Sequence, residues 1–153
     1  MKILRLSFQN INSLAHPEGK TDKPWDIDFT RFNGLFAITG PTGSGKTTIL
    51  DAIVLALYGK TPRVDEQTNR SYAFVGLGAK RASSEVLFEA NHTTYLAQWE
   101  YRTLSKTGRP LAAPEITHKI YQVDGNSKRE LGELGKKDTK SIKDYISLSY
   151  EDF

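Results

Sequence analysis

The sequence predicts an α/β fold in which a buried helix packs against a central sheet. Three consecutive features carry this prediction. The apolar run at residues 35–38 is typical of a strand that is covered on both faces. A glycine-rich loop at residues 40–47 follows directly, and the almost wholly apolar stretch 48–58 then predicts a helix buried on most sides.

Alternating segments elsewhere predict further strands. Residues 3–8 alternate, with Leu4, Leu6 and Phe8 on one face, and residues 25–29 alternate in the same way. The other expectations, in chain order, are a loop at 15–24, helix-stop signals at Gly59 and Pro62, an irregular stretch at 60–83, a hairpin of strands 86–90 and 95–102 around a turn at 91–93, a loop at 105–114, a strand at 116–123, a turn at 124–126 and a short helix at 138–147.

The composition excludes several classes of protein. The 153 residues are 38% apolar and 25% charged, which is typical of one globular domain or part of a larger one. The absence of cysteine excludes disulfides and thiolate metal sites. Because no run approaches the ~18 apolar residues of a membrane span and no signal peptide opens the chain, we expect a cytoplasmic protein with no membrane partner. The net charge of +3 is compatible with a nucleic-acid partner but does not require one.

The glycine-rich loop carries the chemistry. Residues 40–47 match the pattern Gly-x-x-x-x-Gly-Lys-Thr in full, and the predicted strand before it and helix after it are the context that this pattern requires. Its glycines let backbone N–H groups surround an anion, and the helix adds its positive end. Lys46 would reach the β- and γ-phosphates, and the Thr47 hydroxyl would bind a magnesium ion. The loop therefore predicts binding of ATP with Mg²⁺.

Hydrolysis has weaker support in the sequence. A hydrolytic enzyme of this type needs an acidic residue at the end of an apolar strand, and neither Asp124 nor the pair Glu151 and Asp152 has that setting. For Asp51, a helix-dipole or surface role is favoured over catalysis. The basic residues Lys80, Arg81, Lys128, Arg129, Lys136 and Lys137 are interpreted as parts of solvated loops rather than nucleic-acid contacts. We therefore assign no catalytic residue within this sequence.

Four segments resemble the SbcC family. Members of this family are SMC-like, ABC-type ATPases of DNA repair. They are the opening residues 1–14, residues 26–30 followed by 34–53 with the loop, Tyr58-Gly59-Lys60-Thr61-Pro62-Arg63, and the ending 145–153. The resemblance covers most of the chain but only the amino-terminal lobe of the family. It implies that residues 1–153 form the amino-terminal part of an ABC-type head, a P-loop NTPase fold with a mixed central sheet and an antiparallel strand layer. It also implies that the glutamine loop, signature motif, acidic strand and switch histidine lie beyond Phe153.

The resemblance also implies an activity and partners. Family members hydrolyse ATP, and two copies of the head, each carried on a long coiled coil, enclose two ATP molecules. Head closure gates the access of double-stranded DNA to a nuclease subunit of the SbcD type. Carried over by position, the cofactor-binding residues are Thr42, Gly43, Ser44, Gly45, Lys46, Thr47, Thr48 and Asn12, with Thr47 as the metal ligand. Asn12 occupies a position where relatives often have an arginine near the nucleotide.

Other functions remain open at this point. The loop is shared by all P-loop proteins, so another P-loop ATPase or a small-molecule kinase is an alternative. A kinase would need an acceptor pocket and an arginine-rich lid, and the sequence shows neither. A third alternative is a non-catalytic module that only binds nucleotide or DNA.

Overall fold

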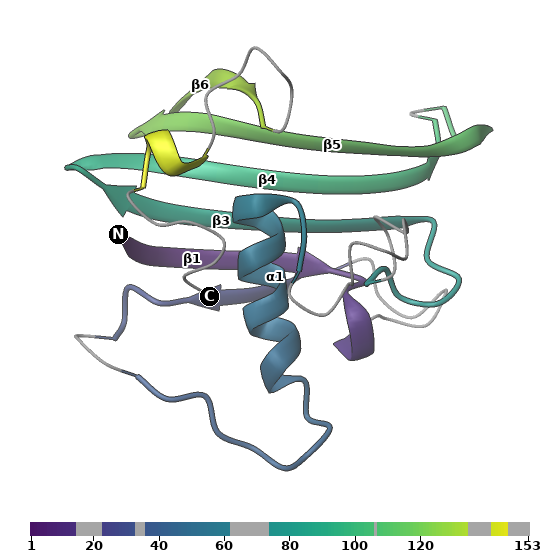
Figure 1. Cartoon of the computed structure of the whole chain (residues 1–153), viewed down its shortest axis with the longest axis horizontal. Helices are drawn as coiled ribbons and strands as arrows, with labels where there is room; N and C mark the ends of the chain where they lie inside the picture. The colour runs from purple at the N-terminus through teal and green to yellow at the C-terminus, as the bar shows by residue number, and fades with distance from the viewer. Residues whose placement is uncertain (15–22, 33–35, 62–73, 106, 135–141, 147–153) are drawn as a thin grey trace.

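One six-stranded sheet with a helix across it forms the body of the protein (Figure 1). The computed structural model describes residues 1–14, 23–32, 36–61, 74–105, 107–134 and 142–146. The strand order is β2-β1-β3-β4-β5-β6. The elements are β1 (Lys2–Gln9), η1 (Asn12–Leu14), β2 (Trp25–Asp28), α1 (Lys46–Tyr58), β3 (Arg81–Ala90), β4 (Thr93–Leu104), β5 (Pro110–Asp124), β6 (Ser127–Glu133) and η3 (Ile142–Asp144).

The combination of sheet and buried helix is confirmed, but its predicted layout is not. All strand pairs among the described residues are antiparallel, so the mixed central sheet is not found there. Residues 36–39 form no strand, and Phe36 is 47% exposed, so the buried strand predicted at 35–38 is wrong for its described part. A strand needs a neighbour for its hydrogen bonds. This segment runs away from the described sheet, where it finds none (Figure 1).

A bulge in β1 changes which side chains face the core. Ile3 and Arg5 pair with adjacent residues of β3, so Leu4 is an extra residue on β1. Ile3 therefore packs with the core that contains Leu6 and Phe8, whereas Leu4 lines a hollow beside Arg5. The prediction that Leu4 shares a face with Leu6 and Phe8 is wrong because the bulge interrupts the alternation.

The predicted hairpin is confirmed as β3 and β4, and both strands are longer than predicted. Asn91 and His92 connect them with φ angles of 51° and 60°. Left-handed backbone at both central residues is the geometry of a type I′ turn, which matches the twist of the paired strands. β3 begins at Arg81, inside the stretch expected to be irregular, because Ala82 and Ser84 continue the series of buried residues.

The last two strands depart from the sequence prediction. β5 begins at Pro110, so the loop expected at 105–114 is too long. Arg102 pairs with Glu115 and Leu104 with Pro110, and this register shift lets the chain around Pro114 enter the strand without a regular ladder. β6 was not predicted, because its seven residues are mostly charged and exposed at the edge of the sheet.

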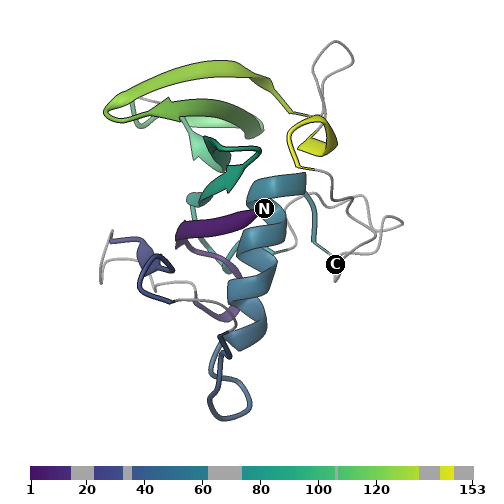
Figure 2. The ribbon, with the colours of Figure 1, turned by 90° about the vertical axis from the view of Figure 1, so that its left-hand side faces the viewer.

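The core lies between the sheet and α1, on the face that the helix covers (Figure 2). Trp99 is 1% exposed, and the Phe74 ring meets it edge-on with centroids 5.2 Å apart. Two sheet side chains also bond the helix backbone. The Ser84 hydroxyl donates to the Ala52 carbonyl at 2.6 Å, and His118 Nε2 donates to the Ala56 carbonyl at 2.7 Å.

Two other predicted segments lie partly outside the described residues. Half of the helix predicted at 138–147 lies outside the described residues, and within the described residues 142–146 only the single turn η3 is helical. The loop predicted at 15–24 also lies largely outside them. In the portion of the chain that the structure describes, no helix is long and apolar enough to cross a membrane.

Candidate functional site

The amino-terminal end of α1 has no side-chain cap. Gly45 is the capping residue, with φ at 86°, a left-handed conformation that glycine adopts without strain. The first turn of this helix carries no acidic residue. Because the N–H groups of a first helical turn have no partner within their own helix, they and the helix dipole make this end positive.

Two glycines shape the loop at residues 40–47 for different reasons. Gly43 has φ at 82°, and a Cβ there would meet nothing within 4 Å, so only its backbone conformation requires glycine. At Gly45 a Cβ would also lie 2.8 Å from the side chain of Leu14. Leu14, in η1, therefore packs directly against the loop at Gly45. The sequence reasoning missed it, because no local pattern around Leu14 signals this contact.

Lys46 places its ammonium group against the loop itself. Its Nζ donates hydrogen bonds to the carbonyl oxygens of Gly40 and Pro41, both at 2.7 Å. The Ser44 N–H closes a turn on the Pro41 carbonyl at 3.2 Å. The loop thus folds back toward the start of α1, and the Lys46 ammonium lies against the carbonyl oxygens of its first two residues.

The residues predicted from the motif are consecutive and gather at this end of α1, but their exposure differs. Thr42, Gly43, Ser44 and Thr47 are exposed, and Lys46 is half-buried. Gly45 and Thr48 are buried, and the Thr48 side chain is only 3% exposed. The hydroxyl of Thr47 is therefore open to a ligand from solvent, whereas that of Thr48 is covered.

Asn12 lies beside the helix, and its side chain is engaged with the protein. Its Nδ2 donates to Oδ2 of Asp51 at 2.9 Å, and its backbone N–H donates to the Phe74 carbonyl at 2.8 Å. Asp51 is only 3% exposed, so the surface role expected for it is wrong. The signal for burial was present, since Asp51 stands in a stretch of α1 whose other residues are almost all apolar.

The basic residues expected in loops are solvent-exposed where they are described, at Lys80, Arg81, Lys128 and Arg129, and Arg81 and Lys128 contact neighbouring side chains. Arg81 forms an ion pair with Glu100 at 3.2 Å, and the Lys128 ammonium lies 3.9 Å from the centre of the Tyr121 ring. Lys128 and Arg129 belong to strand β6 rather than to a loop. Lys136 and Lys137 lie outside the described residues.

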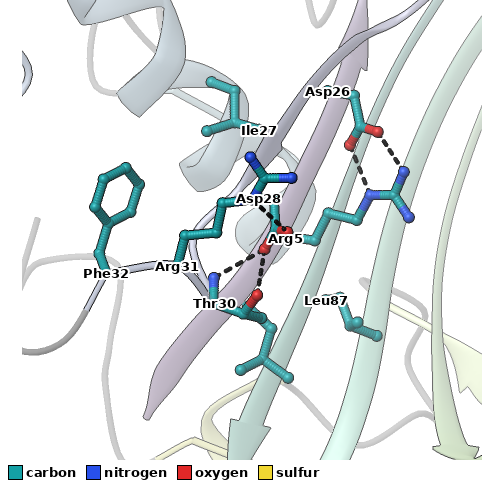
Figure 3. A pocket seen from close by; sticks show the side chains of 9 residues that line it. Arg5, Asp26, Ile27, Asp28, Thr30, Arg31, Phe32 and Leu87 are labelled. Atoms are coloured by element: carbon teal, nitrogen blue, oxygen red, sulfur yellow. Dashed lines mark hydrogen bonds and ion pairs between the residues drawn. The ribbon is translucent and has the colours of Figure 1, made fainter.

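A separate hollow of about 730 Å³ lies over β1 and β2 and shares no residue with the loop (Figure 3). Arg5 donates from Nε to Asp26 Oδ1 at 2.6 Å, and this hydrogen bond lowers the pKa of the Asp26 carboxyl. Asp28 accepts from the Thr30 N–H at 2.9 Å and lies 3.5 Å from Arg31. Both arginines of this hollow face carboxylates, which balances their charge.

Comparison with known proteins identifies relatives along the whole chain. The profile of the AAA domain family matches residues 5–152. The SbcC component of the SbcCD nuclease from Rhodobacter capsulatus is 34% identical over 178 aligned positions, covering 100% of this chain and 13% of the relative. The same component from Pseudomonas aeruginosa is 49% identical over 75 residues, covering 46% of this chain and 6% of the relative.

A further relative is a probable DNA double-strand break repair Rad50 ATPase from Aquifex aeolicus, 40% identical over 80 residues, covering 52% of this chain and 8% of that protein. The chain therefore spans only 6–13% of the length of these relatives. The match of the family profile nevertheless extends over nearly all of the sequence. The chain belongs to the AAA domain family, and its sequence is SbcC-like along its whole length.

Proposed function

We propose that this chain binds ATP with magnesium through residues 42–48 in a P-loop fold, as the amino-terminal part of the head of an SbcC-like ATPase. The observation that carries this proposal is the meeting of a lysine ammonium with the uncapped, positive end of α1. Phosphate oxygens bear negative charge and accept hydrogen bonds, so they suit both groups. Lys46 would exchange the Gly40 and Pro41 carbonyls for the outer phosphates.

The exposed hydroxyl of Thr47 fits a magnesium ion. Magnesium prefers oxygen ligands and keeps several waters together with substrate phosphates, so a protein hydroxyl can supply one ligand at such a site. Thr47 stands in the first turn of α1 and is open to solvent. Bound there, the ion would neutralise phosphate charge, while Lys46 and the loop N–H groups hold the nucleotide in place.

The larger role rests on the relatives. These relatives are named as a nuclease component and a probable DNA double-strand break repair ATPase. We therefore propose that a second copy of the head closes over the nucleotide, that an SbcD-like nuclease and double-stranded DNA are partners, and that a coiled coil joins the head's two parts. Work on chromosomal DNA would place the protein in the cytoplasm of a bacterial cell. Turnover of ATP is assigned to the head as a whole.

Titration with magnesium–ATP tests the binding proposal. Lys46→Ala removes the main cationic contact, and we expect a loss of affinity of roughly a hundredfold, since a hydrogen bond to a charged group contributes about 1.5–3 kcal/mol. Lys23→Ala removes an exposed lysine outside the loop and should leave affinity unchanged. Amide resonances of residues 40–48 should shift on titration. Equal affinity of Lys46→Ala and the parent chain would overturn the proposal.

The same preparation separates the alternatives. A small-molecule kinase would transfer phosphate to an added metabolite, which product analysis detects directly. A non-catalytic module would bind nucleotide without releasing phosphate, even when the other part of the head is supplied. Phosphate release that requires both parts of the head supports the ATPase.

A further inference from the structure

The turn η1 contacts α1 at two places, and both contacts concern the nucleotide end of the helix. Leu14 lies under Gly45, where a Cβ would approach it to 2.8 Å. Asn12 donates to the Asp51 carboxylate at 2.9 Å. Asp51 follows Lys46 by five residues, which is roughly 7.5 Å along the helix axis. The turn η1 thus contacts both Gly45, which caps α1, and Asp51, in the second turn of the helix.

Asn12 itself is firmly placed. Its backbone N–H is bonded to the Phe74 carbonyl, and the neighbouring Ile11 forms a β-bridge with Val75. Its φ is 44°, a left-handed conformation that asparagine tolerates better than most residues. The backbone of Asn12 is therefore held by the segment at Phe74, and its side-chain amide is held by Asp51.

A polar contact of this kind does what apolar packing does poorly. Apolar surfaces attract without direction, so a helix can slide or turn on a sheet with little change in burial. A hydrogen bond has a preferred distance and angle, and a buried carboxylate that loses its donor is unfavourable. The pair Asn12 and Asp51 thereby fixes the height and rotation of the first turn of α1, which carries Lys46 and Thr47.

We propose that Asn12 is a positioning residue of the nucleotide site, which acts through Asp51 on the loop rather than by contacting the nucleotide. The proposal rests on the proposed function of residues 42–48 as the ATP site. Its observation is that the donor of Asn12 is already committed to a carboxylate that is 3% exposed.

A double-mutant cycle on magnesium–ATP affinity tests this. Asn12→Gly removes the side chain while keeping the left-handed backbone free of strain. Asp51→Ala removes the acceptor. We expect each change to weaken binding about tenfold, and the double variant to be no weaker than Asp51→Ala alone, because Asn12 then has no acceptor through which to act. Asp51→Asn keeps an acceptor oxygen for the Asn12 amide and should restore most of the affinity.

Ser84→Ala is the matched control. It also removes a buried hydrogen bond to α1, at the neighbouring residue Ala52, but it leaves η1 untouched. It should reduce stability and leave ATP affinity unchanged. Losses for Asn12→Gly and Asp51→Ala that multiply in the double variant would mean that Asn12 meets the nucleotide directly, and the proposal would be wrong. Unchanged affinity in Asn12→Gly would also contradict it.

A measurement without nucleotide keeps the two proposals distinguishable. In the nucleotide-free chain, the amide resonances of Gly43, Gly45 and Lys46 should move in the same way in Asn12→Gly and Asp51→Ala, and not in Ser84→Ala. If the parent chain binds no ATP but these shifts appear, the proposed function fails and the positioning of the loop stands. If the resonances do not move, the positioning inference fails whatever the affinity of the parent chain.

Discussion

The hairpin β3–β4 and the segment 36–45 both contain apolar residues that favour a strand, yet only the hairpin forms a ladder of hydrogen bonds. In the hairpin, ten residue pairs run from Arg81 opposite Arg102 to Ala90 opposite Thr93, and Trp99 is 1% exposed. In the segment, Phe36 is 47% exposed and the described residues before the loop form no strand. An apolar run therefore forms a strand only where another segment lies beside it and exchanges backbone hydrogen bonds with it.

The largest effect should come from the hairpin side of this comparison. Trp99→Ala removes the largest fully buried side chain, and we expect the free energy of unfolding to fall by about 3–5 kcal/mol. Phe36→Ala is the matched aromatic change in the segment and should cost less than about 1 kcal/mol, because half of the ring is already in water. Denaturation with urea measures both. Equal losses would show that the segment is packed as tightly as the hairpin.

The next effect concerns the loop at the end of the segment. Gly45→Ala forces a left-handed backbone on alanine, which costs about 1–2 kcal/mol, and it also displaces Leu14. Gly108→Ala has a similar φ of 81° with nothing within 4 Å, so it isolates the backbone cost. We expect the first variant to be less stable than the second and to bind ATP more weakly. When Leu14→Ala is also present, the difference in unfolding free energy between Gly45→Ala and Gly108→Ala should narrow. An unchanged difference would exclude the collision of the new Cβ with Leu14 as its cause.

A third prediction concerns His118, where the helix meets the sheet. Burial lowers the pKa of His118, although its bond to the Ala56 carbonyl acts in the opposite direction. The folded chain therefore favours the neutral ring. The contribution of His118 to the free energy of unfolding is fully present above the unfolded pKa of about 6.5. That stability is lost as pH falls from there through the lower folded pKa. In His118→Gln the unfolding free energy should decline less over this range. Parallel pH profiles for the two chains would contradict this account of the contact between helix and sheet.

The smallest effect is expected at the tip of the hairpin. His92 adopts a φ of 60° at the second central position of the turn, where glycine is preferred. His92→Gly relieves this conformation but gives the unfolded chain more freedom, so we expect a gain of only about 0.5 kcal/mol. Gly125→Ala, at a φ of 55° in the β5–β6 turn, is the reverse change and should lose stability. Thermal unfolding resolves both, and a loss in His92→Gly would mean that the ring has contacts of its own.

Much of the fold could be predicted from local pattern, and the failures have physical causes. The helix 46–58 and the turn at Asn91 were predictable because their residues carry the signal themselves. The bulge at Leu4 and the strand β6 were not, since one depends on strand pairing and the other on an edge that needs few apolar residues.

The site divides in the same way. The loop was visible as a contiguous motif, and the structure brings residues 42–48 together at one end of α1. The link from Asn12 to Asp51 joins residues 39 apart in sequence, and no local pattern announces it. Whether these residues hold a nucleotide stays a prediction.

The contact of Lys46 with Gly40 and Pro41 has a consequence for selectivity. An ammonium group has three N–H donors, and two of those of Lys46 are already bonded to neutral carbonyl oxygens of the loop. A ligand that engages this group fully has to compete with those oxygens. An acceptor carrying formal negative charge offers the ammonium a stronger bond than a neutral carbonyl does, so the loop's own backbone favours phosphate-bearing ligands over neutral ones.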